Sequence, residues 1–418
     1  MPAMEVWIDD SSLGGVALVG YLEKAPNPRG DVLSFEYASD WLAGNCAVAP
    51  FQLDPDLPLF SGRMFAHGTS SNLTGAFQDC SPDRWGCVLM DRREAIDARL
   101  SGRHPGTLRA WDYLVGVHDH ARMGALRLRD PTTKTYIDNS QLSAPPVAEL
   151  RTLEEAARQL ETKPDAPAQE QHQWLMQLLA PGTSLGGARP KASFTDVDGS
   201  MWLAKFPSAD DRYDVGLWEF VCHRLAQSAG IWMPEARATP LSSSGHTYCV
   251  RRFDRTDQSR RAYASAMTLL GADATEGRSY LDLAELIEHE GTSDTIEANL
   301  EQLFRRMVFN VLVGNRDDHL RNHGFIRKGN GWVLSPAFDV NPNPYKQGHV
   351  LGVCFDDPMP GADKLVTMHE FFHMSEENAQ GLLGQIRQTV SGWADQARRA
   401  GALGVEITMM GAVIDADR

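Results

Sequence analysis

The sequence predicts an α+β fold with a mostly β beginning and a mostly α-helical end. Runs of aromatic and β-branched residues, separated by Gly, Pro and Asn, occupy residues 6–37 and are typical of short strands. A second strand pattern with a tight turn covers residues 192–206. From residue 280 onward, apolar residues recur every three or four positions, which indicates amphipathic helices.

The N-terminal part is expected to be a small, mostly β region. Its strands are predicted at residues 6–8, 15–22, 32–37 and 124–129. A helix is predicted at residues 108–117. Another helix begins after Asp83, whose side chain is suited to cap it. Trp85, on the first turn of that helix, is expected in the core because a large indole rarely stays on the surface.

A polar connector at residues 131–146 predicts a domain boundary, so the first domain is residues 1–145. The second domain, residues 146–255, is expected to contain helices at 147–161, 172–179 and 215–230, the hairpin, and strands at 238–241 and 246–253. The third domain, residues 256–418, is predicted to be mostly helical. Its helices are expected at 280–289, 295–312 and 376–400 and in a run from 405, with an irregular stretch at 342–360.

Composition limits the partners and the compartment. The formal net charge of −15 argues against non-specific binding to DNA or to anionic membranes, because both would repel the protein. The six cysteines are scattered and lack the spacing of a zinc site, so they indicate buried thiols in a reducing compartment. No signal-peptide pattern and no apolar run of membrane-spanning length is present, and a cytoplasmic protein is expected.

The loop after the helix at 295–312 carries the strongest functional signal. Asp317 and Asn322 lie in this loop, and a tight turn at 328–331 returns the chain so that Asp339 is expected beside Asn322. Phosphoryl transfer needs a carboxylate that orients the attacking hydroxyl, and oxygen ligands that hold Mg²⁺ on the nucleotide phosphates. The spacing therefore predicts Asp317 as the base, and Asn322 and Asp339 as metal ligands. Polar residues that only cap and turn the chain are the structural alternative.

A glycine-rich loop at residues 181–191 precedes the hairpin, and Lys205 lies on the second strand of that hairpin. Glycines let backbone N–H groups approach phosphate oxygens, and the lysine supplies a compact positive charge. The order of a Walker A motif is absent, which disfavours the P-loop NTPases. Glu219, on the helix at 215–230, is either a partner for a catalytic lysine or an exposed surface carboxylate.

Together these motifs resemble those of the HipA-type kinases, the toxins of bacterial type II toxin–antitoxin systems. The resemblance is carried by residues 184–191, 202–207, 252–255 and 317–322, and in the N-terminal part by 83–86 and 124–127. It implies a protein-kinase-like, two-lobed fold with a small, mostly β N-terminal subdomain and an all-α C-terminal lobe.

The resemblance also implies ATP and Mg²⁺ as cofactors and assigns site residues. Asp317 would be the catalytic base, Asn322 and Asp339 would hold the metal, and Lys205 would hold the nucleotide phosphates. The residues implied to bind the nucleotide are Lys205, the loop residues Ser184, Leu185, Gly186, Gly187 and Ala188, and the hinge residues Arg251 and Phe253.

Ser184 matches a serine that such kinases autophosphorylate, a modification that displaces the loop because it adds close to two negative charges beside the nucleotide. Three residues depart from the family pattern. Arg251 replaces an acidic residue, Asp318 replaces a small residue beside the catalytic Asp, and Pro190 restricts the loop. Asp318 would either raise the pKa of Asp317 or supply another metal contact.

The resemblance further implies a protein substrate such as an aminoacyl-tRNA synthetase and a DNA-binding antitoxin of HipB type, through which contact with DNA would be indirect. A small-molecule phosphotransferase of the same fold is the first alternative, since the site chemistry does not identify the acceptor. A metal-dependent nuclease built on Asp317, Asp318, His319 and Asp339 is a second, and a regulatory module that binds nucleotide without catalysis is a third.

Overall fold

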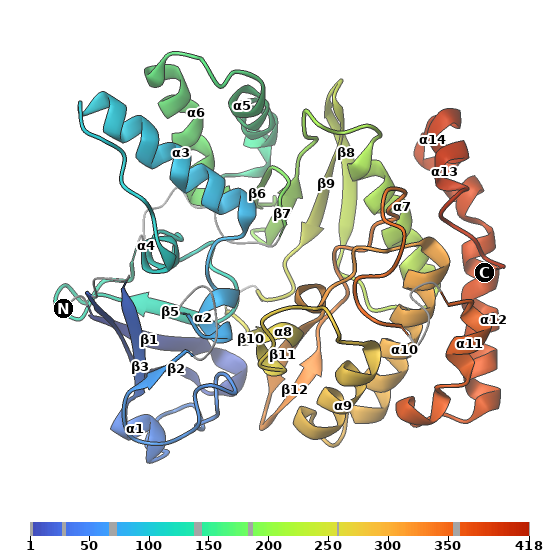
Figure 1. The fold of residues 1–418 in the computed structure, drawn as a ribbon, viewed down its shortest axis with the longest axis horizontal. Helices are drawn as coiled ribbons and strands as arrows, with labels where there is room; N and C mark the ends of the chain where they lie inside the picture. Colours follow the sequence, from blue (N-terminus) through green and yellow to red (C-terminus); the bar gives the residue numbers. More distant parts are fainter. Residues whose placement is uncertain are drawn as a thin grey trace. The chain divides into compact units, whose positions relative to one another are not determined.

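The computed structural model describes residues 3–26, 31–66, 73–137, 144–182, 187–256, 259–353 and 360–417. The chain forms two compact units (Figure 1). Unit 1 comprises Met1–Asp210 and Pro240–Ala264, and unit 2 comprises Asp211–Thr239 and Ser265–Arg418. The predicted limits at residues 145 and 255 remain predictions.

A five-stranded sheet opens unit 1, in the order β4-β3-β2-β1-β5. Its strands are β1 (Ala3–Asp10), β2 (Gly15–Ala25), β3 (Val32–Tyr37), β4 (Met64–Phe65) and β5 (Leu126–Arg129). All neighbouring pairs are antiparallel, and one face of β1 buries Val6 and Ile8 completely. The four predicted strands are confirmed, whereas the two-residue β4 is too short to leave a sequence pattern.

The helices of unit 1 are α1 (Ser39–Leu42), α2 (Gly75–Asp79), α3 (Arg84–Leu100), α4 (Ala110–Val115), α5 (Leu150–Thr162) and α6 (Ala168–Gly182), with short 3-10 turns η1 (Ser11–Leu13) and η2 (Val147–Glu149). Asp83 caps α3 as predicted, because its Oδ1 accepts a hydrogen bond from the N–H of Gly86 at 2.7 Å. Trp85 is buried, as predicted. It belongs to a core that α3, α5 and α6 share with the second sheet.

The second sheet has the order β6-β7-β9-β8. Its strands are β6 (Lys191–Thr195), β7 (Met201–Lys205), β8 (Ala236–Ser242) and β9 (Gly245–Arg251). β6 and β7 form the predicted hairpin, in which Lys191 lies opposite Lys205. β9 ends at Arg251 rather than at Phe253, because the next residues turn away to form buried polar contacts.

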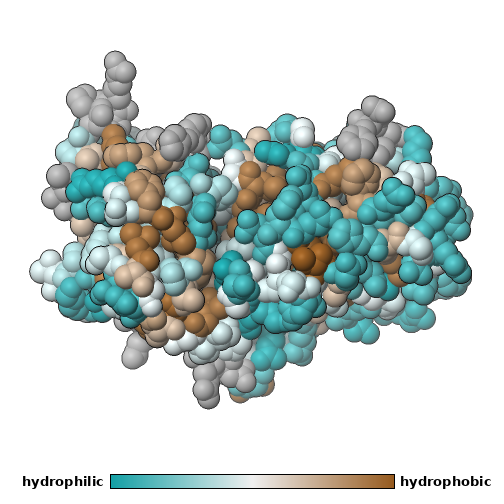
Figure 2. Space-filling model, turned by 90° about the horizontal axis from the view of Figure 1, so that it is seen from below, coloured by the Kyte–Doolittle hydropathy of each residue, from teal (hydrophilic) through white to brown (hydrophobic). Residues whose placement is uncertain are grey.

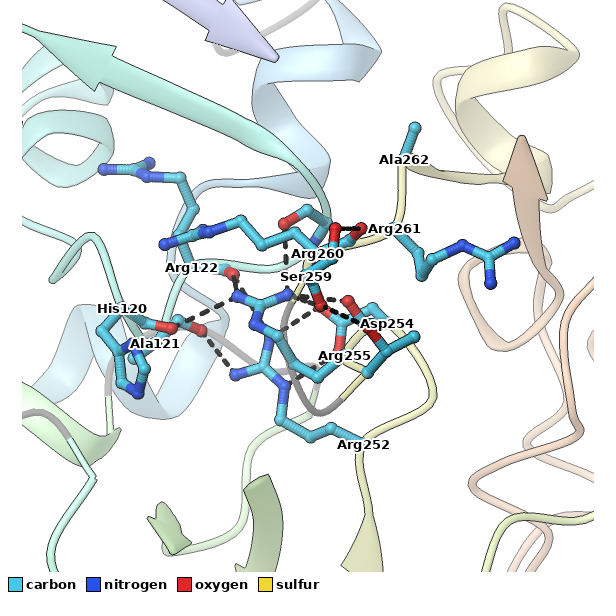
Figure 3. A network of polar contacts seen from close by, with 12 residues as sticks. His120, Ala121, Arg122, Arg252, Asp254, Arg255, Ser259, Arg260, Arg261 and Ala262 are labelled. Atoms are coloured by element: carbon cyan, nitrogen blue, oxygen red, sulfur yellow. Dashed lines mark hydrogen bonds and ion pairs between the residues drawn. The ribbon is translucent and has the colours of Figure 1, made fainter. Parts of the chain in front are cut away.

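Those polar contacts join two stretches of unit 1 that are far apart in the sequence (Figure 3). Asp254 accepts hydrogen bonds from Arg252 at 2.7 and 2.9 Å, from Arg255 at 2.5 Å and from the N–H of Gly124 at 2.8 Å. Arg252 also donates to the carbonyl of Ala121 at 2.7 Å. Burial acts to raise the pKa of Asp254, but the two guanidinium groups outweigh it and hold that pKa well below its usual range.

The helices that follow are α7 (Val215–Ser228), α8 (Ala266–Leu269), α9 (Tyr280–Glu290), α10 (Ile296–Val313), α11 (Ala362–Val366), α12 (Glu376–Ser391), α13 (Trp393–Ala400) and α14 (Gly404–Met410). A three-stranded sheet accompanies them, in the order β10 (Tyr263–Ser265), β11 (Gly324–Lys328), β12 (Gly331–Leu334). The resemblance implied an all-α C-terminal lobe. The structure corrects this expectation, because the C-terminal part is mainly α-helical but also contains this three-stranded sheet. The single helix predicted at 376–400 is broken at Gly392 into α12 and α13.

α10 is the central helix of unit 2 and ends at Gly314. Gly314 has φ +66°, and an added Cβ would lie 2.2 Å from Cγ1 of Val413. Only glycine adopts that backbone conformation without strain in so little space. The glycine therefore fixes the point at which the chain leaves the helix and enters the loop that contains Asp317.

The face in Figure 2 is mostly hydrophilic over the C-terminal helices, and its hydrophobic residues gather near the N-terminal sheet. Large, exposed apolar side chains of the strands β2 to β4 and the segment between β3 and β4 are Val16, Tyr21, Leu59, Phe60 and Phe65. Within the described ranges, no helix is long and apolar enough to cross a membrane.

His373 follows η4 (His369–Phe372) and binds two helices of unit 2. Its Nδ1 lies 2.9 Å from Glu297 Oε1 and its Nε2 lies 2.7 Å from Glu288 Oε1. The hydrogen bond to Glu297, and then that to Glu288, raise the pKa of His373 above 6.5. Because the folded-state pKa is the higher one, the contact stabilises the fold fully below the unfolded pKa and is lost as pH rises through the folded pKa.

We therefore expect the melting temperature of the wild type to exceed that of His373→Gln by more at about pH 5.5 than at about pH 8.5. Thermal denaturation of both proteins at the two pH values measures this difference. An equal gap at both values would show that the imidazole charge contributes nothing. The exposed side chain keeps the expected effect small.

Candidate functional site

The loop between α10 and β11, residues 315–323, is called the catalytic loop here. It carries Asp317, whose side chain is 55% exposed, and η3 (Leu320–Asn322), which ends on the buried Asn322. Asn322 Nδ2 donates to the carbonyl oxygen of Asp317 at 3.4 Å. The two predicted residues therefore lie together in one loop, with a carboxylate directed to solvent and an amide packed behind it.

Asp318, unlike its neighbour, is buried and fully engaged. Its Oδ2 accepts hydrogen bonds from Tyr280 Oη at 2.5 Å, His323 Nε2 at 3.0 Å and Asn310 Nδ2 at 3.2 Å. Burial acts to raise the pKa of Asp318, but the nearby His323, together with Tyr280, outweighs it and lowers that pKa. Asp318 is thus committed to protein partners, which disfavours the metal contact considered for it in the sequence.

The segment that follows Asp339 returns to the catalytic loop, as the hairpin of β11 and β12 predicts. The N–H of Asn343 donates to the carbonyl of Gly314 at 3.0 Å, and that of Leu351 donates to the carbonyl of Asp318 at 3.0 Å. Asp339 itself has φ +58°, in the left-handed region that non-glycine residues rarely occupy. Strained backbone of this kind concentrates at functional sites.

Lys346, from the same returning segment, forms an ion pair with Asp317 Oδ1. Its main chain is fixed on both sides: Arg316 Nη1 donates to its carbonyl at 2.7 Å, and its N–H donates to Asn343 Oδ1 at 3.1 Å. Arg316 thus braces the loop. Since both charged side chains are exposed, the ion pair adds little stability to the fold. It nevertheless places the positive charge of Lys346 beside the carboxylate of the predicted base.

The oxygen donors suit a hard cation. Because Asn322 uses its Nδ2 as a donor, its Oδ1 remains directed elsewhere and is an appropriate magnesium ligand, as is the carboxylate of Asp339. Asp339 Oδ1 accepts from Asn341 Nδ2 at 3.3 Å. Over the described part of the chain, no cluster of three or more His, Cys, Asp or Glu could hold a metal ion. A metal here would depend on these two side chains and on phosphate oxygens.

The remaining predicted residues belong to unit 1. Ser184, Leu185 and Gly186 lie outside the described residues, whereas Gly187 and Ala188 are exposed. The carbonyl of Gly187 accepts from the N–H of Trp85 at 3.4 Å. Lys205 ends β7, with its Nζ 5.8 Å from the centre of the Tyr248 ring.

A buried ion pair anchors the end of the glycine-rich loop. Lys191 Nζ lies 2.6 Å from Asp83 Oδ2, and the two side chains are only 2% and 6% exposed. The pair therefore fastens the first residue of β6 to the N-terminus of α3. Arg251, predicted in the adenine hinge, lies opposite Trp202 in the sheet, and the centre of the Phe253 ring, also predicted there, is 6.1 Å from that of Tyr263.

Glu219 on α7 is 3% exposed, so its interpretation as a surface carboxylate is wrong. Its burial beside Cys222 raises the thiol pKa further than burial of the thiol alone would. Two histidines of the catalytic loop, His319 and His323, are candidates to bind a neighbouring carboxylate. In the structure His323 binds Asp318, with its Nε2 3.0 Å from Asp318 Oδ2.

Comparison with known proteins agrees with this geometry. The family model of the HipA-like C-terminal domain matches residues 183–394, more than half of the chain, and includes the glycine-rich loop, Lys205, the catalytic loop and Asp339. The chain belongs to the HipA family. The match confirms the family resemblance inferred from the motifs.

A HipA chain of Shewanella oneidensis, solved in a complex with HipB and operator DNA, superposes with a TM-score of 0.62 over 98% of this chain and 94% of that one. At 18% identity, this similarity establishes the HipA fold. A Sinorhizobium fredii protein with the name "Putative kinase Y4dM" is 27% identical over 167 residues, and a "Putative kinase" of Haemophilus influenzae is 26% identical over 189. These matches span 36% and 40% of this chain, but 39% and 54% of the relatives.

Two features of this HipA-family site were missed in the sequence. Lys346 lies in an irregular stretch without periodicity, so no pattern pointed to its contact with Asp317. The partners of Asp318 come from α9 and α10, and only the tertiary fold brings Tyr280 and Asn310 to it. The departure of Asp318 from the family pattern was the one available signal.

Proposed function

We propose that the protein is an ATP- and Mg²⁺-dependent serine/threonine protein kinase of the HipA type, and the toxin of a type II toxin–antitoxin system. The observation that carries the proposal is the geometry of unit 2. Asp317 and Asn322 share one loop, and the segment after Asp339 is hydrogen-bonded back to that loop through Gly314 and Asp318. This is the set of groups that phosphoryl transfer requires.

Each group has a role in the proposed reaction. The Asp317 carboxylate orients the acceptor hydroxyl and takes its proton, and Lys346 leaves the second carboxylate oxygen for that contact. Asn322 and Asp339 would hold Mg²⁺, which neutralises charge on the transferred phosphoryl group. Lys205 and the loop Ser184–Ala188 would hold the nucleotide phosphates, and Arg251 and Phe253 would flank the adenine.

Ser184 is the proposed autophosphorylation site. Its match to a serine that HipA-type kinases autophosphorylate supports this assignment, and the added charge would drive the loop away from the bound nucleotide. The proposed protein substrate is an aminoacyl-tRNA synthetase or another translation factor. A DNA-binding protein of HipB type is the proposed partner, supported by the HipB that accompanies the Shewanella HipA.

A nuclease site built on Asp317, Asp318, His319 and Asp339 is not supported, because Asp318 is occupied by three protein donors. A small-molecule phosphotransferase remains the alternative that the same site chemistry allows. The nature of the phosphorylated product separates it from a protein kinase.

The test is transfer of the labelled γ-phosphate from ATP, with mass spectrometry of the products. We expect phosphoserine or phosphothreonine on protein, with self-phosphorylation at Ser184. Lys205→Met should reduce transfer by about a hundredfold, because a phosphate-binding cation is lost. Lys328→Met, which removes an exposed lysine from an ion pair with Asp294, is the control and should leave transfer unchanged. Label found only on a metabolite, or full activity in Lys205→Met, would overturn the proposal.

A further inference from the structure

Two residues of the catalytic loop that have no role in the reaction bind each other. Asp318 directly follows Asp317, His323 directly follows Asn322, and their side chains meet at 3.0 Å. We infer that Asp318 and His323, with Tyr280 and Asn310, form a loop staple that positions Asp317 and Asn322. This inference rests on the proposed function, and it makes the four staple residues positioning residues.

The staple is built from three elements of unit 2. Tyr280 is the first residue of α9, Asn310 lies on the last turn of α10, and Asp318 and His323 belong to the loop itself. All three donors converge on one oxygen of Asp318, and Asn310 Nδ2 also donates to Tyr280 Oη at 2.9 Å. The four side chains are buried. Such a network is strong because water does not compete for its hydrogen bonds.

Further contacts support the same arrangement. The rings of Tyr280 and His323 meet edge to face, with centroids 5.5 Å apart and planes at 82°. Asn315 Nδ2 donates to Asn310 Oδ1 at 3.2 Å, which ties the start of the loop to the same helix. The carbonyl of His323 accepts from the N–H of Ala266 at 2.8 Å. The end of the loop is thus fixed through main chain and side chain together.

The consequence follows from the spacing. Asp318 directly follows the proposed base Asp317, and His323 directly follows the proposed metal ligand Asn322. The contact between Asp318 and His323 therefore closes the loop at its base and sets how far Asp317 lies from Asn322. Among the described residues, the side chain of Asp317 contacts the exposed Lys346, so its position depends on this buried support. A displacement of about 1 Å in a reacting group costs about a hundredfold in rate.

The test compares Tyr280→Phe and His323→Phe, which remove donors and keep the rings, with His323→Gln, which keeps an N–H donor. We expect the two Phe variants to lose tenfold to about a hundredfold in kcat per folded molecule, with a higher Mg²⁺ requirement and a nearly unchanged KM for ATP. His323→Gln should restore much of kcat. Hydrogen exchange of residues 314–324 should accelerate in the Phe variants only.

Tyr37→Phe is the matched control, since it removes another buried tyrosine hydroxyl, whose hydrogen bond to the carbonyl of Leu57 is 2.8 Å long. It should lower the melting temperature without changing kcat. If the Phe variants behave like Tyr37→Phe, the staple only stabilises the fold and the inference is wrong. If the wild type transfers no phosphate, the proposed function fails, whereas hydrogen exchange still decides whether the staple holds the loop.

Discussion

Asp317→Asn should reduce phosphotransfer by about a thousandfold while leaving the melting temperature within experimental error. The amide is isosteric with the carboxylate but cannot accept the proton of the acceptor hydroxyl. The side chain is half exposed, and its contact within the described residues is an exposed ion pair with Lys346, so the fold should not change. Initial rates with labelled ATP, together with thermal denaturation, measure both quantities.

Asp363→Asn is the appropriate control for this variant. Asp363 is also an exposed aspartate paired with a cation, Arg387 at 2.8 Å, and it belongs to α11 rather than to the catalytic loop. Its substitution should leave the rate unaltered. Equal rates for Asp317→Asn and the wild type would mean that Asp317 is not the base and that the phosphoryl-transfer assignment of this loop is wrong.

Asp254→Asn is expected to cause the largest loss of stability. The carboxylate is 1% exposed and binds two arginines, so removing its charge leaves the buried guanidinium groups of Arg252 and Arg255 without a counter-ion. Breaking a buried ion pair from one side costs about 3–5 kcal/mol. Urea denaturation of the wild type and the variant measures the difference in the free energy of unfolding.

The control for Asp254→Asn is Asp395→Asn, since Asp395 pairs with Arg398 at 2.6 Å but both side chains are more than half exposed. It should shift stability by less than about 0.5 kcal/mol. A loss below about 1 kcal/mol in Asp254→Asn would show that the arginines find other acceptors, among them the carbonyls of residues 120–122 to which they already donate (Figure 3).

Much of the fold was predictable because its signals are local. The helices predicted at 280–289 and 295–312 are α9 and α10 to within one residue, since long amphipathic patterns specify both periodicity and ends. The break between α12 and α13 at Gly392 was not predictable, because the apolar pattern continues across it. The strands of the N-terminal sheet followed from alternation and turn residues, but their order β4-β3-β2-β1-β5 depends on pairing over long sequence distances.

In the candidate site, too, local features were predictable and long-range contacts were not. The proximity of Asp317 and Asn322, and the return of the chain after Asp339, followed from one loop length and one hairpin. The network around Asp318 and the contact of Lys346 did not, because they depend on side chains from separate elements that meet only in the folded chain. Sequence reasoning placed the predicted base and a predicted metal ligand in one loop, and it missed the side chains of other elements that support this loop.

The left-handed backbone of Asp339 limits which replacements can evolve there. Glycine would relieve the torsional cost, and asparagine would tolerate it, but each discards the negative charge. Glutamate would retain the charge, yet its longer chain is disfavoured at a positive φ. Mutational drift at this one codon should therefore yield well-folded descendants that lack the proposed metal-binding carboxylate more readily than descendants that keep it.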